Sequence, residues 1–293
     1  MNYRHLSVYV AGINGYQENR KDPLDVLNAK RLIGTDPSGR GLKNMDERMQ
    51  QEISDMDERM QRKFSDQDKL TQKKTPKQLR KVIDLASRGK RRDAITEITN
   101  YIKKKPNDPM AYILRGDLYD DMGQKEVAID DYSEAIRLQP ELSGAYDKRA
   151  TAYAELGRLS EAIQEHKKAI EIKPKALYYY NMAVAYDSLN DNRNAIYSNT
   201  KALELDNGHT QAYYMRGISY SQIGDYQKAI ADYNKALALV PEFIRDVYFR
   251  RAEAYQEVGK KTLALADFRK AMEHTYDQEN LEIIEDKIQE LTK

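Results

Sequence analysis

The feature that most constrains this chain is a group of residues that recurs about every 34 positions over its C-terminal part. Each copy holds a small residue, a Tyr, a Gly, two Ala that flank a large side chain, and a Pro; one copy reads Gly116, Tyr119, Gly123, Ala128, Tyr132, Ala135 and Pro140. A fixed period of this length is typical of stacked helix pairs, each of which buries its apolar face against its neighbours. Such arrays present extended binding surfaces, so the repeat predicts a binding protein and no enzyme.

Each copy predicts two helices with a defined turn. In the copy from Pro109, helix A is expected from Met110 to Met122, and Gly123 supplies the left-handed residue that ends it. Helix B is expected to end near Leu138, because Pro140 has no N–H group and its ring clashes with the preceding turn. Small residues are expected where the helices cross, with aromatic rings beside them: Gly116, Ala128 and Ala135, then Tyr112, Tyr119 and Tyr132.

This pattern resembles the tetratricopeptide repeat, with copies that begin near Thr75, Pro109, Ser143, Ala176, Thr210 and Arg245. The first copy diverges, with Val82 in the small slot, and the fourth carries Asn190 in place of the turn glycine. Asn is the next best residue for a left-handed turn, so that departure is mild. The resemblance implies an all-α solenoid of about six helix–turn–helix repeats over residues 75–278, followed by a capping helix at 279–293.

Composition removes several classes of function. The chain has no Cys, which excludes disulfides, thiolate metal sites and a cysteine nucleophile. Its four His are scattered, so neither a metal site nor a cofactor is predicted, and no catalytic residue is assigned. No apolar run approaches the roughly 20 residues that a membrane-spanning helix needs, and a cytoplasmic location is expected.

In the family that the repeat resembles, the A helices line a concave groove to which five positions of each repeat point. Carried over to the five clear copies, these positions hold nine acidic residues and neither Lys nor Arg. The acidic residues assigned to the groove are Asp117, Asp120, Asp121, Asp147, Glu155, Asp187, Glu253 and Glu257, with Asp246 as the ninth. An apolar strip runs inside the groove: Tyr180, Val184, Tyr214, Ile218 and Phe249. We therefore expect a basic peptide or helix with one or two apolar anchors, unless the acids only keep an exposed surface soluble.

A basic block precedes this acidic region. From Lys73 to Pro106 there are twelve basic and three acidic residues, although the whole chain has a net charge of only +1. Its central residues are Lys77, Arg80, Lys81, Arg88, Lys90, Arg91 and Arg92. Three interpretations remain: contact with nucleic acid or another anionic surface, head-to-tail self-association, or a solvated charged cap. The lack of interleaved aromatic residues argues against nucleic acid.

The N-terminal part does not repeat. Residues 1–44 are predicted to be irregular or partly disordered, and 45–74 to form an amphipathic Met-rich helix and a polar linker. A stripe at helical spacing marks this helix: Met45, Met49, Ile53, Met56, Met60 and Phe64. The helix either caps the first repeat or joins two chains into a homodimer through residues 45–64.

These observations favour a non-enzymatic adaptor or scaffold. One alternative is a peptide-responsive transcription regulator, which requires a helix-turn-helix of roughly 60 residues and finds no room for it in the Gly/Pro/Asn-rich stretch 14–44. A secretion or assembly chaperone is the other alternative, and it stays open. Family members that grip acidic chaperone tails need Lys in slots that here hold Met110, Ile113, Asp147 and Gln211. These residues argue against that role, because an acidic groove would repel such a tail.

Overall fold

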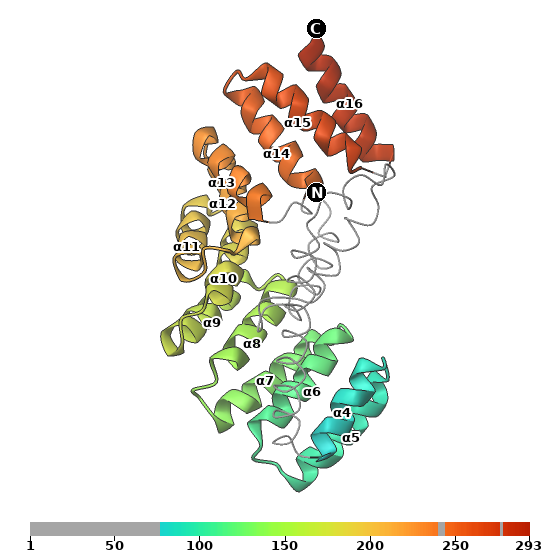
Figure 1. Cartoon of the computed structure of the whole chain (residues 1–293). Helices are drawn as coiled ribbons and strands as arrows, with labels where there is room; N and C mark the ends of the chain where they lie inside the picture. The colour runs from blue at the N-terminus through green and yellow to red at the C-terminus, as the bar shows by residue number, and fades with distance from the viewer. Residues whose placement is uncertain (1–76, 240–243, 276–277) are drawn as a thin grey trace, which may run out of the picture. The chain divides into compact units, whose positions relative to one another are not determined.

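The computed structural model describes residues 77–239, 244–275 and 278–293 (Figure 1). These residues form thirteen helices, labelled α4 to α16, and none of them lies in a strand. The all-α repeat fold predicted from the sequence is therefore confirmed. The predictions for residues 1–44 and 45–74, with the homodimer helix at 45–64, fall outside the described residues.

The chain divides into two compact units, Met1–Asn107 and Asp108–Lys293. The described part of the first unit is one helix pair, α4 (Lys77–Ser87) and α5 (Arg91–Lys104). Its buried residues recur at helical spacing along both helices: Leu79, Val82, Ala94, Ile98, Tyr101 and Ile102. This pair corresponds to the divergent first repeat of the sequence.

The second unit consists of five further helix pairs and one last helix. The first helix of each pair is an A helix: α6 (Pro109–Asp121), α8 (Ser143–Glu155), α10 (Ala176–Ser188), α12 (Thr210–Gln222) and α14 (Ile244–Glu257). The second is a B helix: α7 (Lys125–Leu138), α9 (Leu159–Ile172), α11 (Asn192–Leu205), α13 (Tyr226–Leu239) and α15 (Lys261–Glu273). Each helix packs against the next along the chain, so the pairs stack in sequence order (Figure 1). The second to sixth repeats are these five pairs.

The turns follow the expected backbone chemistry. Gly123 ends α6 with φ +73°, a backbone conformation in which a residue with a Cβ atom would be strained. Asn190 takes the same place after α10 with φ 57°, and it is the one non-glycine residue with positive φ in the described part of the chain. Pro140 lies just beyond Leu138, where α7 ends.

Inside each repeat a small residue of the A helix faces a larger residue of the B helix 16 positions later. A Cβ atom on Gly116 would lie 2.6 Å from the ring of Tyr132, and one on Gly217 would lie 2.6 Å from the ring of Tyr233. Where the A helix carries Ala, the partner is not Tyr. The five pairs are Gly116 with Tyr132, Ala150 with His166, Ala183 with Asn199, Gly217 with Tyr233, and Ala252 with Phe268. All five larger side chains are at most 1% exposed, so this contact sets how closely the two helices approach.

The last helix, α16 (Gln278–Thr292), covers the apolar end of α15. Ile284 is buried, and Ile288 and Leu291 pack with it against Phe268 and its neighbours. Its other side is exposed and carries acidic residues such as Glu279, Glu282 and Glu285. A helix with one apolar and one charged side is what an array needs at its end, as predicted.

Candidate functional site: the A-helix face

Successive A helices of the second unit contact one another: α8 with α10, α10 with α12, and α12 with α14. Their side chains therefore form one continuous surface, the A-helix face. The groove residues predicted from the sequence lie on these helices, and their burial and partners show which of them this surface can offer to a ligand.

Four of the five predicted apolar residues are half-buried. Val184 of α10, Tyr214 and Ile218 of α12, and Phe249 of α14 each show part of their surface. Phe249 also packs edge-on against Phe268, with ring centroids 5.5 Å apart. Together these four residues form the apolar strip. It crosses three adjoining helices and offers contact area to a partner.

Tyr180, the fifth predicted apolar residue, belongs to the core. Only 8% of its surface is exposed, and its ring lies 4.9 Å from the ring of His209. It packs with Ala202, Leu203 and Ala212. Tyr180 therefore stabilises α10 by packing in the core and does not offer a contact at the surface.

Several predicted acids are paired with lysines that position counting overlooked. Lys148 lies 3.0 Å from Asp117, which also accepts a hydrogen bond of 2.9 Å from the Tyr132 hydroxyl. Lys125 contacts Asp120 at 2.8 Å and also pairs with Glu155 of the next repeat. Both lysines occupy slots outside the five family positions, so the acidic surface of the second and third repeats is partly neutralised.

Asp147 differs from the other predicted acids because it is buried. It is 7% exposed, it accepts a hydrogen bond of 3.1 Å from the Asn181 amide, and the His166 Nδ1 atom lies 3.0 Å from the same oxygen. Asn181 belongs to α10, one repeat further on. Asp147 therefore ties the third repeat to the fourth, and it is not a surface for a ligand.

Of the remaining predicted acids, Asp246 lies in the first turn of α14, whereas Asp121, Asp187, Glu253 and Glu257 lie toward the C-terminal ends of their A helices. Glu253 accepts a hydrogen bond of 3.1 Å from Arg250, and Asp246 pairs with Arg245 at 2.7 Å. Asp121 and Glu257 are exposed. Burial raises the pKa of the half-buried Asp187, while the positive charge of Arg250 opposes this shift.

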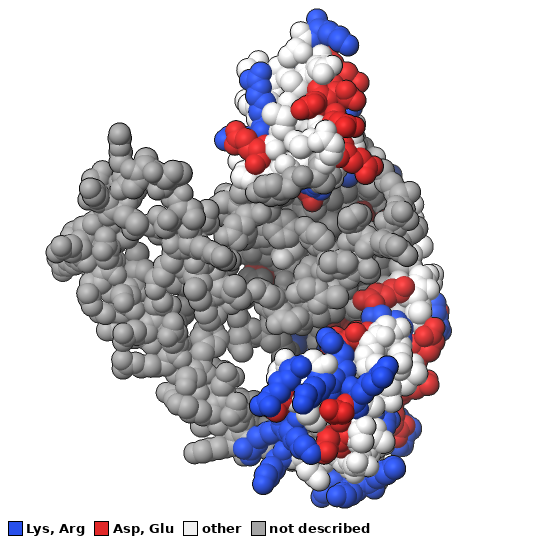
Figure 2. Space-filling model, turned by 90° about the vertical axis from the view of Figure 1, so that its right-hand side faces the viewer, with Lys and Arg blue, Asp and Glu red and all other residues white. Residues whose placement is uncertain are grey.

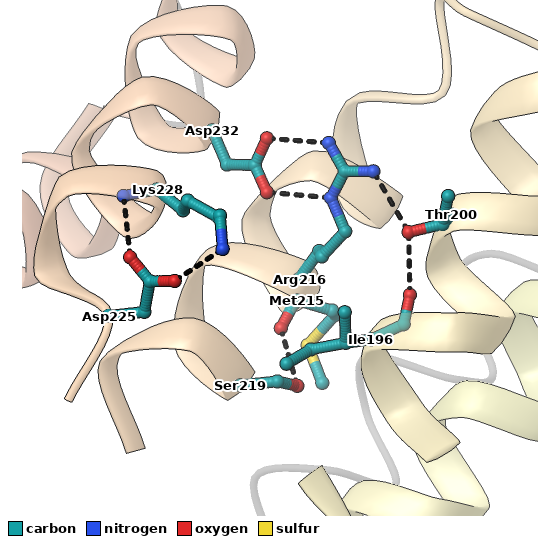
Figure 3. A network of polar contacts seen from close by, with 8 residues as sticks. All are labelled: Ile196, Thr200, Met215, Arg216, Ser219, Asp225, Lys228 and Asp232. Carbon is teal, nitrogen blue, oxygen red and sulfur yellow. Dashed lines mark hydrogen bonds and ion pairs between the residues drawn. The ribbon is translucent and has the colours of Figure 1, made fainter. Parts of the chain in front are cut away.

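Sequence reasoning missed an arginine that recurs at a fixed place in the A helices. Arg216 donates from Nε and Nη2 to Asp232 at 2.7 and 2.8 Å, and from Nη1 to Thr200 of the preceding repeat at 3.1 Å (Figure 3). The guanidinium carbon also lies 5.7 Å from the ring centroid of Tyr213. We call Arg216 and its counterparts clamp arginines, and Arg216 joins its own two helices to the B helix before them.

The clamp recurs wherever an acid follows the arginine by 16 residues. The pairs are Arg115 with Asp131, Arg149 with Glu165, Arg216 with Asp232, and Arg251 with Asp267. Arg149 also donates to Ser133 at 2.9 Å, and Arg251 to Asn234 at 2.5 Å. The fourth repeat lacks the clamp, because Met182 and Ser198 occupy its two places. The 16-residue spacing was visible in the sequence, and it would have identified the pairs.

The basic block is exposed on α4 and α5, where Lys and Arg side chains gather (Figure 2). Its ion pairs include Lys81 with Glu97 at 2.6 Å and Arg88 with Asp84 at 2.9 Å. All seven predicted residues, the basic cluster, have exposed side chains: Lys77, Arg80, Lys81, Arg88, Lys90, Arg91 and Arg92. The exposure fits all three interpretations of this block.

Among the described residues there is no group of three His, Cys, Asp or Glu side chains that could hold a metal ion. No described helix is long and apolar enough to cross a membrane. Location in the cytoplasm stays a prediction.

Comparison with protein families gives a match over five helix pairs. A model described as tetratricopeptide repeat matches residues 111–142, 143–175, 176–209 and 246–273. A second model with the same description matches residues 210–243. The matched segments are the second to sixth repeats.

Solved structures similar to this chain include the MamA protein, at 28% identity over 56% of this chain and 90% of MamA, with a TM-score of 0.53. A tetratricopeptide repeat protein from Parabacteroides merdae is 23% identical over 72% of this chain and 84% of its own, with a TM-score of 0.59. YrrB, described as a TPR protein with an unusual peptide-binding site, is 20% identical over 62% of this chain and 93% of its own, with a TM-score of 0.54. The latter two show the fold alone. No match was found among the curated proteins.

Proposed function

The chain belongs to the tetratricopeptide repeat family, and on that premise we propose that it is a non-enzymatic scaffold whose A-helix face binds a basic segment of a partner protein. Repeat arrays of this kind serve protein interaction through extended surfaces. The partner segment carries one or two apolar anchors beside its Lys or Arg residues.

The observation that carries this proposal is the apolar strip and the acids around it. Val184, Tyr214, Ile218 and Phe249 are half-buried on three helices that contact one another. Asp187 lies on the same helix as Val184, and Glu253 follows Phe249 by one helical turn. Aromatic and aliphatic anchors give affinity, whereas carboxylates attract cations and select against acidic partners.

The charge of the face supports a basic ligand even after its lysines and arginines are counted. Without the buried Asp147, eight of the nine predicted acids remain, against four cations that contact them: Lys125, Lys148, Arg245 and Arg250. These acids outnumber those four cations by four. A negative surface raises the local concentration of a cationic segment and speeds its association, an effect that salt weakens.

The test is selection of dodecapeptides displayed on phage against the whole chain, followed by fluorescence anisotropy of the selected peptides at several salt concentrations. We expect enrichment of Lys or Arg together with large apolar residues, and affinity that falls as salt rises. The variant D121N/E257Q removes two exposed acids of the A helices, and it should weaken binding and flatten the salt dependence. E171Q/E204Q removes two exposed acids of B helices and serves as the matched control.

Peptides without basic enrichment would contradict the proposal. So would an equal loss of affinity in the A-helix variant and the B-helix control, because a face-specific site predicts a loss in the first variant alone.

A further inference from the structure

The fourth repeat departs from the others at the residue that fills the space between its two helices. Tyr132, His166, Tyr233 and Phe268 place a ring there, whereas the fourth repeat has Asn199. Asn199 is 1% exposed, and its Oδ1 atom has no hydrogen-bond partner within the described part of the chain. A buried amide oxygen without a donor is rare in folded proteins, so this atom points to a missing partner.

A second acceptor lies at the matching place on the A helix. In the fifth repeat, the hydroxyl groups of Tyr233 and Ser221 lie 3.3 Å apart. The residues 34 positions earlier are Asn199 and Asp187, and α10 and α12 keep the same register over this distance. The Asp187 Oδ1 atom is also buried and also lacks a hydrogen-bond partner among the described residues. The pair of hydroxyls in one repeat is thus replaced by a pair of acceptors in the other.

The concentration of such atoms singles out the fourth repeat. Of the five buried side-chain atoms without a hydrogen-bond partner in the described residues, four belong to it, those of Asp187, Asn192, Ser198 and Asn199; the fifth, His166 Nδ1, lies 3.0 Å from a carboxylate oxygen of Asp147. Three of these four atoms are carboxylate or amide oxygens, which can only accept. Whatever satisfies Asp187 and Asn199 must therefore donate hydrogen bonds.

The negative charge of Asp187 favours a positively charged hydrogen-bond donor over a neutral one. Asp187 is an acid on the face proposed to bind a basic segment, and Arg250 is the cation whose field acts on it. Arg250 already donates to Glu253 at 3.1 Å and makes no ion pair with Asp187. A compact cation with several N–H donors can contact a carboxylate and an amide oxygen at once, and a lysine ammonium group has three such donors.

We propose that the Asp187 carboxylate and the Asn199 amide oxygen, the 187/199 site, receive the ammonium group of a lysine from the bound segment. The inference rests on the proposed function, and it specifies which repeat binds a basic residue of the segment and that this residue is a lysine. The fourth repeat would then bind one lysine of the partner segment, while the apolar strip contacts the apolar anchor residues of the same segment. Asp187 and Asn199 are positioned for this role by α10 and α11 of the same repeat.

The first experiment titrates n-butylammonium chloride, a mimic of the lysine side chain, into the ¹⁵N-labelled whole chain and follows the side-chain amide of Asn199 by NMR. Tetramethylammonium chloride has the same charge and no N–H donor, and methylguanidinium chloride mimics arginine. We expect a saturable shift of the Asn199 amide with n-butylammonium alone. Equal shifts with tetramethylammonium would overturn the proposal, because the shift would then come from charge alone and not from hydrogen bonds donated by an ammonium group. Tighter binding of methylguanidinium would overturn the choice of lysine.

The second experiment uses variants that keep the fold. A183G/D187S/N199Y gives the fourth repeat the set of residues found in the fifth, and D187N keeps the shape of the side chain while removing its charge. D187N should abolish the saturable shift of the Asn199 amide with n-butylammonium. The triple variant has no Asn199, so it is followed through the backbone amides of α10 and α11, and any saturable shift that n-butylammonium causes there in the wild-type chain should disappear. Thermal melting followed by circular dichroism checks that both variants are folded. Retention of the shift in either folded variant would overturn the site.

The two proposals fail in different ways. If no basic peptide binds the whole chain, the proposed function is wrong whatever n-butylammonium does. If a selected peptide binds the wild-type chain and A183G/D187S/N199Y with equal affinity, the scaffold function stands and the 187/199 site is wrong. If the variant loses at least tenfold in affinity only for peptides that contain Lys, both proposals are supported.

Discussion

The clamp arginines make a quantitative prediction about what happens when one partner is removed. Arg216 and Asp232 are mostly buried, with side chains 17% and 7% exposed. The substitution R216M removes three hydrogen bonds and leaves the Asp232 carboxylate buried without a cation. Removal of one partner from a buried ion pair costs about 3–5 kcal/mol, and the residual exposure of Arg216 places the expected loss near the lower end.

The double variant R216M/D232S gives the fifth repeat the residues that the fourth repeat has naturally, Met182 and Ser198. It loses the same hydrogen bonds but leaves no buried charge, so we expect a smaller loss, about 1 kcal/mol. The predicted order is therefore wild type, then double variant, then single variant, with a gap of about 2 kcal/mol between the two variants.

Urea denaturation followed by circular dichroism measures the order through the midpoint of unfolding. Hydrogen exchange of the amides in α12 and α13 locates the effect, because array proteins can unfold in parts. The exposed pair of Arg158 and Glu161 is the control, with side chains 44% and 47% exposed, and R158M should leave the midpoint unchanged. A double variant as unstable as R216M would refute the reasoning, since the loss could not then come from the buried carboxylate.

Three further outcomes are expected. G217A places a Cβ atom 2.6 Å from the Tyr233 ring and should destabilise the chain by about 1–3 kcal/mol, whereas G144A, with its nearest neighbour at 3.8 Å, should stabilise it by about 0.5 kcal/mol in the same urea assay. Burial raises the folded-state pKa of Asp187, so the ionised carboxylate destabilises the folded chain and D187N should stabilise it at pH 7. This gain in stability should disappear as the pH falls below the unfolded-state pKa near 3.8, because the wild-type carboxyl is then protonated in both states. Thermal melts from pH 3 to 7 measure the gain, and a gain that does not change with pH would contradict the prediction. K90S/R92S alters only exposed side chains of the basic cluster and should leave the melting temperature unchanged, and a lower one would show that these residues support the fold.

Most of the fold follows from local rules that a single sequence displays. Gly123, Asn190 and Pro140 fix the ends of helices through their own backbone conformations, which do not depend on distant partners. The small and large residues 16 positions apart predict where the two helices of a repeat cross, because both members of each pair lie close together in the sequence. The period then places each predicted site residue on its helix.

The site was harder to predict because a position in the repeat tells which way a side chain points, but not which other side chain it contacts. Asp147 holds a position that points to the face, yet Asn181 and His166 draw it into the packing between two repeats. Lys125 and Lys148 stand outside those positions and still reach the acids of the face. Side chains of this length cover more than one slot, so the net charge of a surface has to be counted from contacts.

The pairing of small and large residues inside each repeat has a consequence for how this chain can change over time. A Cβ atom at position 217 would lie too close to the Tyr233 ring, whereas Ala150 and His166 coexist two helix pairs earlier in the chain. A repeat that changes from the Gly–Tyr pair to the Ala–His pair therefore avoids strain only if Tyr is replaced by His before Gly is replaced by Ala. The other order leads through a strained Ala–Tyr pair, so change in either direction between these two pairs passes through Gly–His.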